Sequence, residues 1–293
     1  VATGTRVVLV GDPQQLPSVG PGTVLNDLIR SGTVPCTNLT EIYRQSEGSR
    51  IVSNAHRVNA GKMPDLKPLP RGRKADFYWI EQDQPATVVE LIARMVTERI
   101  PRRFGFDPMN DVQVLTPMNR GICGADNLNR LLQQSLNPEP ADELTVGERR
   151  LRLGDRVMQI SNNYDKGVFN GELGRISRVN RKERTLEVNF DVGTVGYDWT
   201  EADQLRHAYA VTVHKSQGSE YPVVILPVLT QHYVMLERNL VYTAMTRAKA
   251  LLVMLGTKKA MGIALANARP RKRVTGLTER LRAARPTPSH PSI

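Results

Sequence analysis

Two polar clusters in the carboxy-terminal half of the chain carry residue types that bind phosphate. Residues 211–220 read Val-Thr-Val-His-Lys-Ser-Gln-Gly-Ser-Glu, and residues 242–249 read Tyr-Thr-Ala-Met-Thr-Arg-Ala-Lys. Between them, residues 223–226 form a β-branched run that predicts a buried strand, and residues 236–245 place apolar side chains at helical spacing. Polar groups at the ends of buried elements are held rigidly, and Arg247 offers donors that match phosphate oxygens. The segment therefore predicts a phosphate site shared between domains; the alternative is a helix whose Arg247 and Lys249 only solvate a surface.

These two strings resemble the last two motifs of a superfamily 1 DNA helicase of the RecD-like type, a family of bacterial DNA repair and recombination. The resemblance implies ATP hydrolysis in a cleft between two RecA-like domains, with Arg247 reaching across it as an arginine finger. It implies that Gly218 and Glu220 contact the ATP. It further implies that single-stranded DNA is held by Thr212, His214, Lys215 and Ser216.

The amino-terminal residues carry a second candidate site. Residues 6–10 are a compact apolar run that predicts a central parallel strand, and its carboxyl end releases a loop that reads Gly-Asp-Pro-Gln-Gln-Leu-Pro over residues 11–17. This loop could be only a turn, but it resembles the third helicase motif, in which Gln15 touches the γ-phosphate. The string around Arg44 resembles the fourth motif and implies a second γ-phosphate ligand. Taken alone, Arg44 would be a salt-bridge partner.

A β-α-β rhythm predicts a second RecA-like sheet. Helices are expected over residues 23–31, 49–60 and 87–100, and strands over residues 77–80, 112–115 and 251–255. The strand over residues 112–115 releases a loop that lies along the single strand in the family. That implies DNA contacts by Thr116, Pro117 and Asn119, whereas a plain proline turn between strand and helix is the alternative.

Residues 151–205 have a different texture, with period-two alternation over residues 156–160, 173–179 and 185–190. Short strands of this kind predict a small barrel, and the family carries an SH3-like barrel at this point. The loop over residues 162–171 combines a base, amides and two aromatic rings, which would suit single-stranded DNA through Asn163 and Phe169. It could equally be a hairpin turn that satisfies its own backbone.

Composition sets the outer limits. The 293 residues include 40 Lys and Arg against 29 Asp and Glu, for a formal charge of +11, which favours a polyanionic partner. Cys36 and Cys123 lie far apart with no neighbouring histidine cluster, so we expect buried thiols in a reducing cytoplasm. No apolar run is long enough to span a membrane.

Two parts of a nucleotide-driven motor are absent from the sequence. There is no Gly-x-x-x-x-Gly-Lys-[Ser/Thr] loop, because the only Gly-Lys pair, Gly61-Lys62, lacks the upstream glycine and precedes Met63. There is also no acidic pair after a strand to hold Mg²⁺. We therefore expect these parts in an amino-terminal remainder of the same polypeptide, and expect this chain alone to be inactive.

The fold class that follows is α/β, with RecA-like parallel sheets and an inserted SH3-like barrel. The expected division is residues 1–45 for the end of a first RecA-like domain, 46–150 with 206–268 for the second, 151–205 for the barrel, and 269–293 for a basic, proline-rich tail. The expected activity is a 5′ to 3′ helicase that uses ATP and Mg²⁺ on single-stranded DNA and on duplexes with a 5′ overhang. A passive nucleic-acid-binding module and an RNA-directed superfamily 1 helicase are the alternatives.

Overall fold

A five-stranded parallel sheet organises the larger part of the computed structural model, which describes residues 2, 4–18, 20–39, 48–68, 70, 72–268, 273 and 275–284. Its strand order is β1-β12-β11-β2-β10, and every neighbouring pair is parallel. This arrangement confirms the α/β fold class. The strands are β1 (Phe77–Glu81), β2 (Val112–Thr116), β10 (Ala210–Thr212), β11 (Tyr221–Val228) and β12 (Ala248–Gly256).

Helices cover both faces of this sheet, which explains why β11 and β12 read as nearly continuous apolar runs. Successive residues of a strand point to opposite faces. Accordingly Val224 and Leu252 join the core beneath one set of helices, and Val223 and Leu251 join the core beneath the other. The first set is α2 (Arg50–Asn59), α6 (Arg238–Met245) and α7 (Lys258–Ala266), and the second is α3 (Pro85–Arg94), η1 (Met95–Arg99), α4 (Ile100–Phe104) and α5 (Ala125–Leu136).

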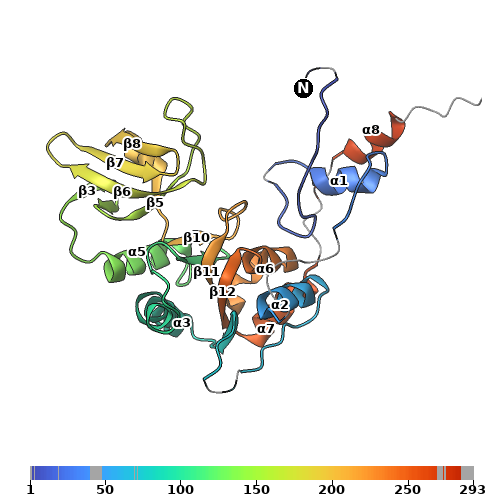
Figure 1. The fold of residues 1–293 in the computed structure, drawn as a ribbon, viewed down its shortest axis with the longest axis horizontal. Helices are drawn as coiled ribbons and strands as arrows, with labels where there is room; N and C mark the ends of the chain where they lie inside the picture. Colours follow the sequence, from blue (N-terminus) through green and yellow to red (C-terminus); the bar gives the residue numbers. More distant parts are fainter. Residues whose placement is uncertain are drawn as a thin grey trace, which may run out of the picture.

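The second sheet is antiparallel and has the strand order β8-β7-β6-β5-β9. It shares one apolar core with the separate β3–β4 hairpin, so the two form a single small β unit that Figure 1 shows beside the parallel sheet. The three strands expected here are present, and four more accompany them. The elements are β3 (Glu143–Val146), β4 (Arg149–Arg152), β5 (Arg156–Gln159), β6 (Leu173–Asn180), β7 (Thr185–Phe190), β8 (Gly193–Asp198), η2 (Glu201–Gln204) and β9 (Leu205–His207).

The amino-terminal segment differs from expectation. Residues 6–10 form no strand, and Val8 and Val10 are 84% and 94% exposed. A strand needs a neighbour for its backbone N–H and C=O groups, and no described residue pairs with this run. The prediction of a central paired strand is therefore wrong for this structure.

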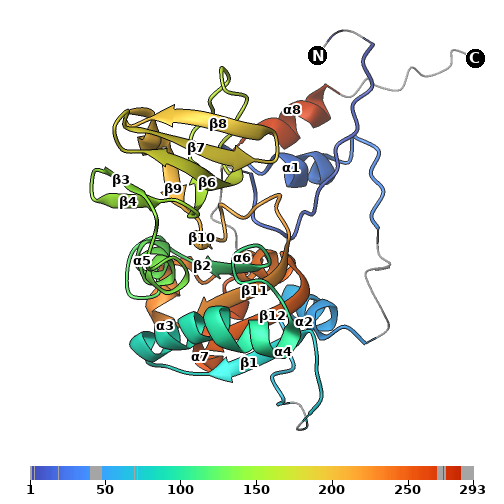
Figure 2. The ribbon, with the colours of Figure 1, turned by 60° about the vertical axis from the view of Figure 1, so that its left-hand side comes forward.

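The two ends of the described chain lie side by side. Helix α1 (Val24–Ser31) packs against α8 (Leu277–Ala283), as both ribbon views show (Figure 1, Figure 2). The Thr278 hydroxyl donates to the Asp27 carbonyl at 3.2 Å, and the Arg282 guanidinium donates to the Arg30 carbonyl at 2.8 Å. The carboxy-terminal helix thus covers the first helix of the chain.

The two thiols have different environments. Cys123 is buried, as expected, and burial raises its pKa to about 11. Cys36 is exposed, because it follows α1 in an extended connection, so the expectation of a buried thiol is wrong there. Within the described residues, no helix is long and apolar enough to cross a membrane.

Candidate nucleotide and nucleic-acid sites

The loop over residues 11–18 is fixed against helix α6 and the loop that precedes β11. The Leu16 amide donates to the Thr243 hydroxyl at 2.8 Å, and both residues are buried. The Gln217 side chain donates to the Leu16 carbonyl at 2.7 Å, and the Tyr242 hydroxyl donates to the Asp12 carboxylate at 3.0 Å. Segments from opposite ends of the chain therefore form one surface.

Arg247 and Gln15 meet on this surface. The Nη2 group of Arg247 donates to Oε1 of Gln15 at 2.9 Å, while Nη1 donates to the Ser219 carbonyl at 2.8 Å and Nε to the Thr243 carbonyl at 3.3 Å. Only 6% of Arg247 is exposed, so it is not a surface-solvating side chain. Buried donors of this kind are held in one geometry, as an anion-binding arginine requires.

A cavity of about 1000 Å³ opens beside this pair and brings together Gln15, Glu220 and Arg247. Glu220 forms an ion pair with Lys249 at 3.3 Å. Further cations line the cavity, and they suit the phosphates of a nucleotide. They are Arg50, Arg73 and Lys74.

Gly218 lies beside a smaller neighbouring cavity that Gln15 also lines. Its φ of +84° lies in the left-handed region, which glycine adopts without strain. It therefore shapes the turn between β10 and β11. Arg44, expected at the γ-phosphate, lies outside the described residues.

The carboxylates that line the nucleotide cavity already have partners within the protein. Mg²⁺ takes oxygen ligands in near-octahedral geometry. No group of three or more His, Cys, Asp or Glu residues in the described part of the chain could hold a metal. Of the carboxylates in this 1000 Å³ cavity, Asp76 accepts from Ser49 and Arg50, Asp12 accepts from Tyr242, and Glu220 forms an ion pair with Lys249. All three already serve the protein's own groups.

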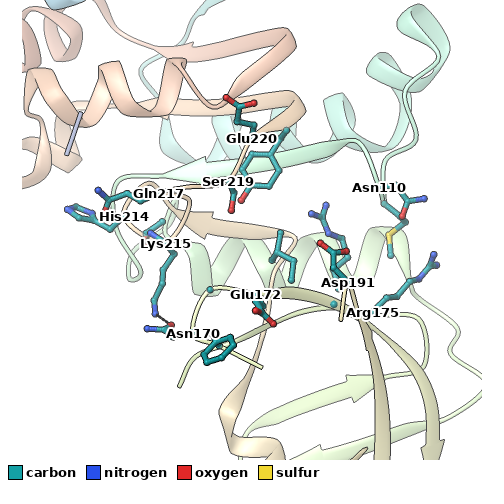
Figure 3. Close-up of a pocket in the computed structure, with 18 of the residues that line it drawn as sticks. Asn110, Asn170, Glu172, Arg175, Asp191, His214, Lys215, Gln217, Ser219 and Glu220 are labelled. Atoms are coloured by element: carbon teal, nitrogen blue, oxygen red, sulfur yellow. Dashed lines mark hydrogen bonds between the residues drawn. The ribbon is translucent and has the colours of Figure 1, made fainter. Parts of the chain in front are cut away.

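A groove of about 1260 Å³ lies between the small β unit and the segments that flank β2, β10 and β11 of the parallel sheet. Figure 3 shows Lys215 extending across it to Asn170, to which its Nζ donates at 2.7 Å. The groove brings together most of the residues expected at single-stranded DNA. From this set it is lined by Pro117, Asn119, Phe169, Thr212, His214 and Lys215.

The charge of the groove is mixed. It is lined by three cations, Arg156, Arg175 and Lys215. It is also lined by three carboxylates, Glu172, Asp191 and Glu220, which Figure 3 labels. The Arg156 guanidinium donates to the Val112 carbonyl and to the side-chain oxygen of Gln113, at 2.8 Å each. Desolvation lowers the pKa of His214, which favours the neutral form of its ring. Lys215 and Arg175 are therefore the cations that this groove presents, and neutral groups supply most of the other contacts.

Two expected DNA ligands are not accessible. Thr116 is fully buried, and its hydroxyl donates to the Cys123 carbonyl at 2.6 Å. Ser216 is also fully buried, and its hydroxyl donates to the Val213 carbonyl at 2.8 Å. Both hydroxyls satisfy the backbone of their own loops, so the structure does not offer them to a ligand. Thr212 is 8% exposed and its hydroxyl accepts from the Lys215 amide at 3.3 Å.

The loop over residues 162–171 has features of both alternatives, the hairpin turn that satisfies its own backbone and the loop that faces single-stranded DNA. Asn163 accepts from the Lys166 amide at 3.1 Å and donates to Gln204 at 3.3 Å, so it holds the hairpin rather than lining the groove. Phe169 is 42% exposed, lines the groove and packs edge-on against Tyr164 at a centroid distance of 5.8 Å. The ring that is available for stacking is thus Phe169, with Tyr164 as its support.

Other residues of the site were not singled out from the sequence. Thr243 and Tyr242 anchor the loop over residues 11–18, and Asn170 receives Lys215. Tyr242 and Thr243 belong to the Tyr-Thr-Ala-Met-Thr-Arg string, whose first two positions were the available signal. For Asn170 no periodicity or spacing distinguished it from its neighbours.

Three family models match successive parts of the chain. An AAA domain matches residues 1–73, the SH3 domain of ATP-dependent RecD-like DNA helicases matches residues 128–190, and the UvrD-like helicase C-terminal domain matches residues 207–255. The SH3 match begins within α5 and takes in the β3–β4 hairpin.

Curated relatives match nearly the whole chain. The ATP-dependent RecD2 DNA helicase of Deinococcus radiodurans is 37% identical over 283 residues, which are 97% of this chain and 37% of that protein. The RecBCD enzyme subunit RecD of Mycolicibacterium smegmatis is 29% identical over 96% of this chain and 50% of that protein. The chain thus spans between about a third and a half of the length of these relatives.

Solved structures of Pif1 helicases resemble this chain more distantly. A structure of two coordinating Pif1 helicases at forked duplex DNA has a TM-score of 0.45 at 18% identity, covering 83% of this chain and 53% of that one. A Bacteroides Pif1 bound to single-stranded DNA has a TM-score of 0.40 at 18% identity, covering 84% and 56%. The family models and the curated relatives carry the assignment: the chain belongs to the RecD-like superfamily 1 DNA helicases and carries the domains of the carboxy-terminal portion of such a protein.

Proposed function

We propose that this chain is part of an ATP-driven motor that moves 5′ to 3′ along single-stranded DNA and unwinds duplexes with a 5′ overhang. The observation that carries the proposal is the contact between Arg247 and Gln15 at the edge of a cation-lined cavity. A neutral amide is a weak partner for a guanidinium, and a phosphate oxygen is a stronger one. Gln15 and Arg247 would therefore turn from each other to the γ-phosphate when ATP binds.

The segment over residues 212–220 would couple the two sites. His214 and Lys215 line the DNA groove, Gln217 bonds the loop over residues 11–18, and Glu220 lines both the groove and the nucleotide cavity. A shift of Arg247 toward ATP would move the Ser219 carbonyl to which it donates. The same short segment would then change its hold on DNA, which is how closure of a cleft becomes motion along a strand.

Within the groove, we propose that Lys215 contacts a phosphate of the single strand and that Phe169 stacks on a base. Pro117, Asn119, Thr212 and His214 would complete the contact surface. Asn163 would act indirectly, by holding the loop that presents Phe169. Arg44 remains a proposed γ-phosphate ligand, and Gly218 would shape the turn next to the nucleotide.

The catalytic Mg²⁺ would take its acidic ligands from outside the described residues, because the carboxylates of the nucleotide cavity, Asp12, Asp76 and Glu220, already have partners within the protein. We therefore propose that the 293-residue chain alone hydrolyses no ATP, since it cannot position the metal or the attacking water. Single-strand-stimulated turnover by the purified chain would contradict this. The division into residues 1–45, 46–150 with 206–268, 151–205 and 269–293 also stands as a proposal, as does a cytoplasmic location.

The proposed activity is tested with matched fluorescent duplexes on a longer polypeptide that contains this chain together with a phosphate-binding loop and an acidic pair for Mg²⁺. Unwinding should require ATP and a 5′ overhang, and a 3′ overhang of the same sequence should support none. An RNA overhang of that sequence serves as the control for substrate class. Equal unwinding from a 3′ overhang would reject the direction, preference for RNA would favour the RNA-directed alternative, and DNA binding without unwinding would favour a passive module.

A further inference from the structure

A second cleft, of about 550 Å³, lies between helix α5 and strands β4 and β9. Figure 2 shows the β3–β4 hairpin between α5 and the antiparallel sheet. None of its lining residues lines the groove assigned to single-stranded DNA. Its basic side chains are Arg130, Arg149, Arg150, Arg152, Arg206 and His207, and the remaining lining side chains are amides or carboxylates.

The positive charge of this cleft is only partly neutralised. Arg152 lies 3.4 Å and Arg150 4.0 Å from Glu143, and these are the ion pairs formed by its arginines with residues that the structure describes. Arg130, Arg149 and Arg206 form none within that part of the chain. Burial lowers the pKa of Arg149, and repulsion from Arg206 lowers it further. A bound anion would relieve that repulsion.

The floor of the cleft is rigid. Gln133 donates to the Arg150 carbonyl at 2.7 Å and to the Asp155 carboxylate at 2.6 Å. Asp155 is fully buried and also accepts from the Tyr209 hydroxyl at 2.8 Å. Arg149 donates to the carbonyls of Leu205 and Asp203 across the junction. The arginines thus project from a fixed base, which reduces the entropy lost when they bind a ligand.

We propose that this arginine cleft binds the sugar-phosphate backbone of duplex DNA. Guanidinium groups match phosphate oxygens, and interfaces with DNA are polar and strongly positive. A protein partner would bury an apolar centre, and no apolar side chain lines the cleft. An unpaired strand would need aromatic rings for its bases, whereas His207 is the only ring here and its side chain is 10% exposed. The inference rests on the proposed function, because it gives the motor a hold on the duplex.

The test uses Arg150→Gln with Arg206→Gln, since both side chains are exposed and their removal spares the Asp155 network. The matched control, Arg99→Gln with Arg102→Gln, removes two exposed charges that do not line the cleft. Affinity of the full chain is titrated against salt with a blunt-ended duplex and with an oligo-dT strand of equal length. The cleft variant should lower the duplex salt slope by about 1.8, twice the value for one phosphate contact. Its oligo-dT affinity should stay within about twofold.

A third variant separates loss of charge from misfolding. Arg150→Lys with Arg206→Lys keeps both charges and should restore most of the slope, whereas a misfolded protein would not regain it. The inference is overturned if the duplex slope is unchanged or if the control lowers it equally. The proposed function fails separately, through absent oligo-dT binding while the cleft variant still alters duplex binding.

Discussion

The guanidinium of Arg247 donates to the side-chain oxygen of Gln15 at 2.9 Å, joining residues that are 232 positions apart in the chain. The loop that carries Gln15 reaches this position because the buried hydroxyl of Thr243 accepts from the Leu16 amide, one helical turn before Arg247. The polar pair at the nucleotide cavity thus depends on a buried contact behind it. A substitution at Thr243 can therefore test how the site is held without changing Gln15 or Arg247.

Thr243→Val should loosen the loop over residues 11–18. The substitution leaves the buried Leu16 N–H without an acceptor, at a cost of about 1–3 kcal/mol. Hydrogen exchange of the Leu16 amide should accelerate by about 5- to 150-fold, because each 1.4 kcal/mol is a factor of about ten. Thr243→Ser keeps the hydroxyl and should exchange as the wild type does. Equal exchange in the valine variant would show that other contacts hold the loop.

Lys215→Ala should weaken single-strand binding in a salt-dependent manner. Removing one phosphate contact from a single strand lowers the salt slope by about 0.7. Lys182→Ala, an exposed charge outside the groove, is the control and should leave the slope unchanged. If Lys215→Ala also leaves affinity and slope unchanged, then its bond to Asn170 has a structural role only.

Phe169→Ala should instead weaken single-strand binding without altering the salt slope. Loss of one stacked base costs about 1–3 kcal/mol and involves no charge. Phe169→Leu retains apolar volume but no ring, so it should lose a comparable share of the affinity. Binding by the leucine variant at the wild-type level would indicate that Phe169 serves packing against Tyr164 and not stacking on DNA.

Asp155→Asn should destabilise the junction between the two sheets, and the effect should depend on pH. Burial alone would raise the pKa of Asp155, but the contact with His207 and the donors Arg152 N and Asn137 outweigh it, so the pKa lies below its usual 3.8. A depressed pKa stabilises the fold at pH values above 3.8, and this contribution is lost as the pH falls through the folded-state pKa.

Urea denaturation at several pH values measures this contribution. At pH 7 the asparagine variant should be less stable by about 1.5–3 kcal/mol, the range for hydrogen bonds to a charged group. The difference from wild type should shrink as the pH is lowered below 3.8. A difference that stays constant over that range would mean that the ionised carboxylate is not what stabilises the junction.

Elements with a strong periodic pattern could be predicted from the sequence. The runs over residues 223–226 and 251–255 are strands of the parallel sheet, because both faces of that sheet are covered. The helix expected over residues 87–100 continues to Phe104 through the π-helical segment η1, which apolar spacing does not reveal. Strand β4 reads Arg-Arg-Leu-Arg and β8 contains two glycines, so neither shows the alternation of a buried strand.

The site could be predicted only in part, because residue type does not show accessibility. Thr116 and Ser216 have the hydroxyls expected of phosphate ligands, yet both are buried and bond their own loops. The run over residues 6–10 predicts burial but does not show whether a neighbouring strand is present to pair with it. The family resemblance implies that Gln15 and Arg247 each contact ATP, but neither it nor any local pattern in the sequence indicates that the two side chains bond each other.

The role of Arg247 at the γ-phosphate is tested most directly by measuring the ATPase activity that single-stranded DNA stimulates in a longer polypeptide, one that contains this chain together with a phosphate-binding loop and an acidic pair for Mg²⁺. Arg247→Lys keeps the charge but not the planar fork, and Arg247→Ala removes both. Two measurements serve as controls for folding. The melting temperature should match that of the wild type, and the affinity for oligo-dT should stay within about twofold of the wild-type value. We predict a fall in kcat of about 10³ or more for Arg247→Ala. An unchanged kcat in both variants would contradict it and leave Arg247 a structural bridge between Gln15 and Ser219.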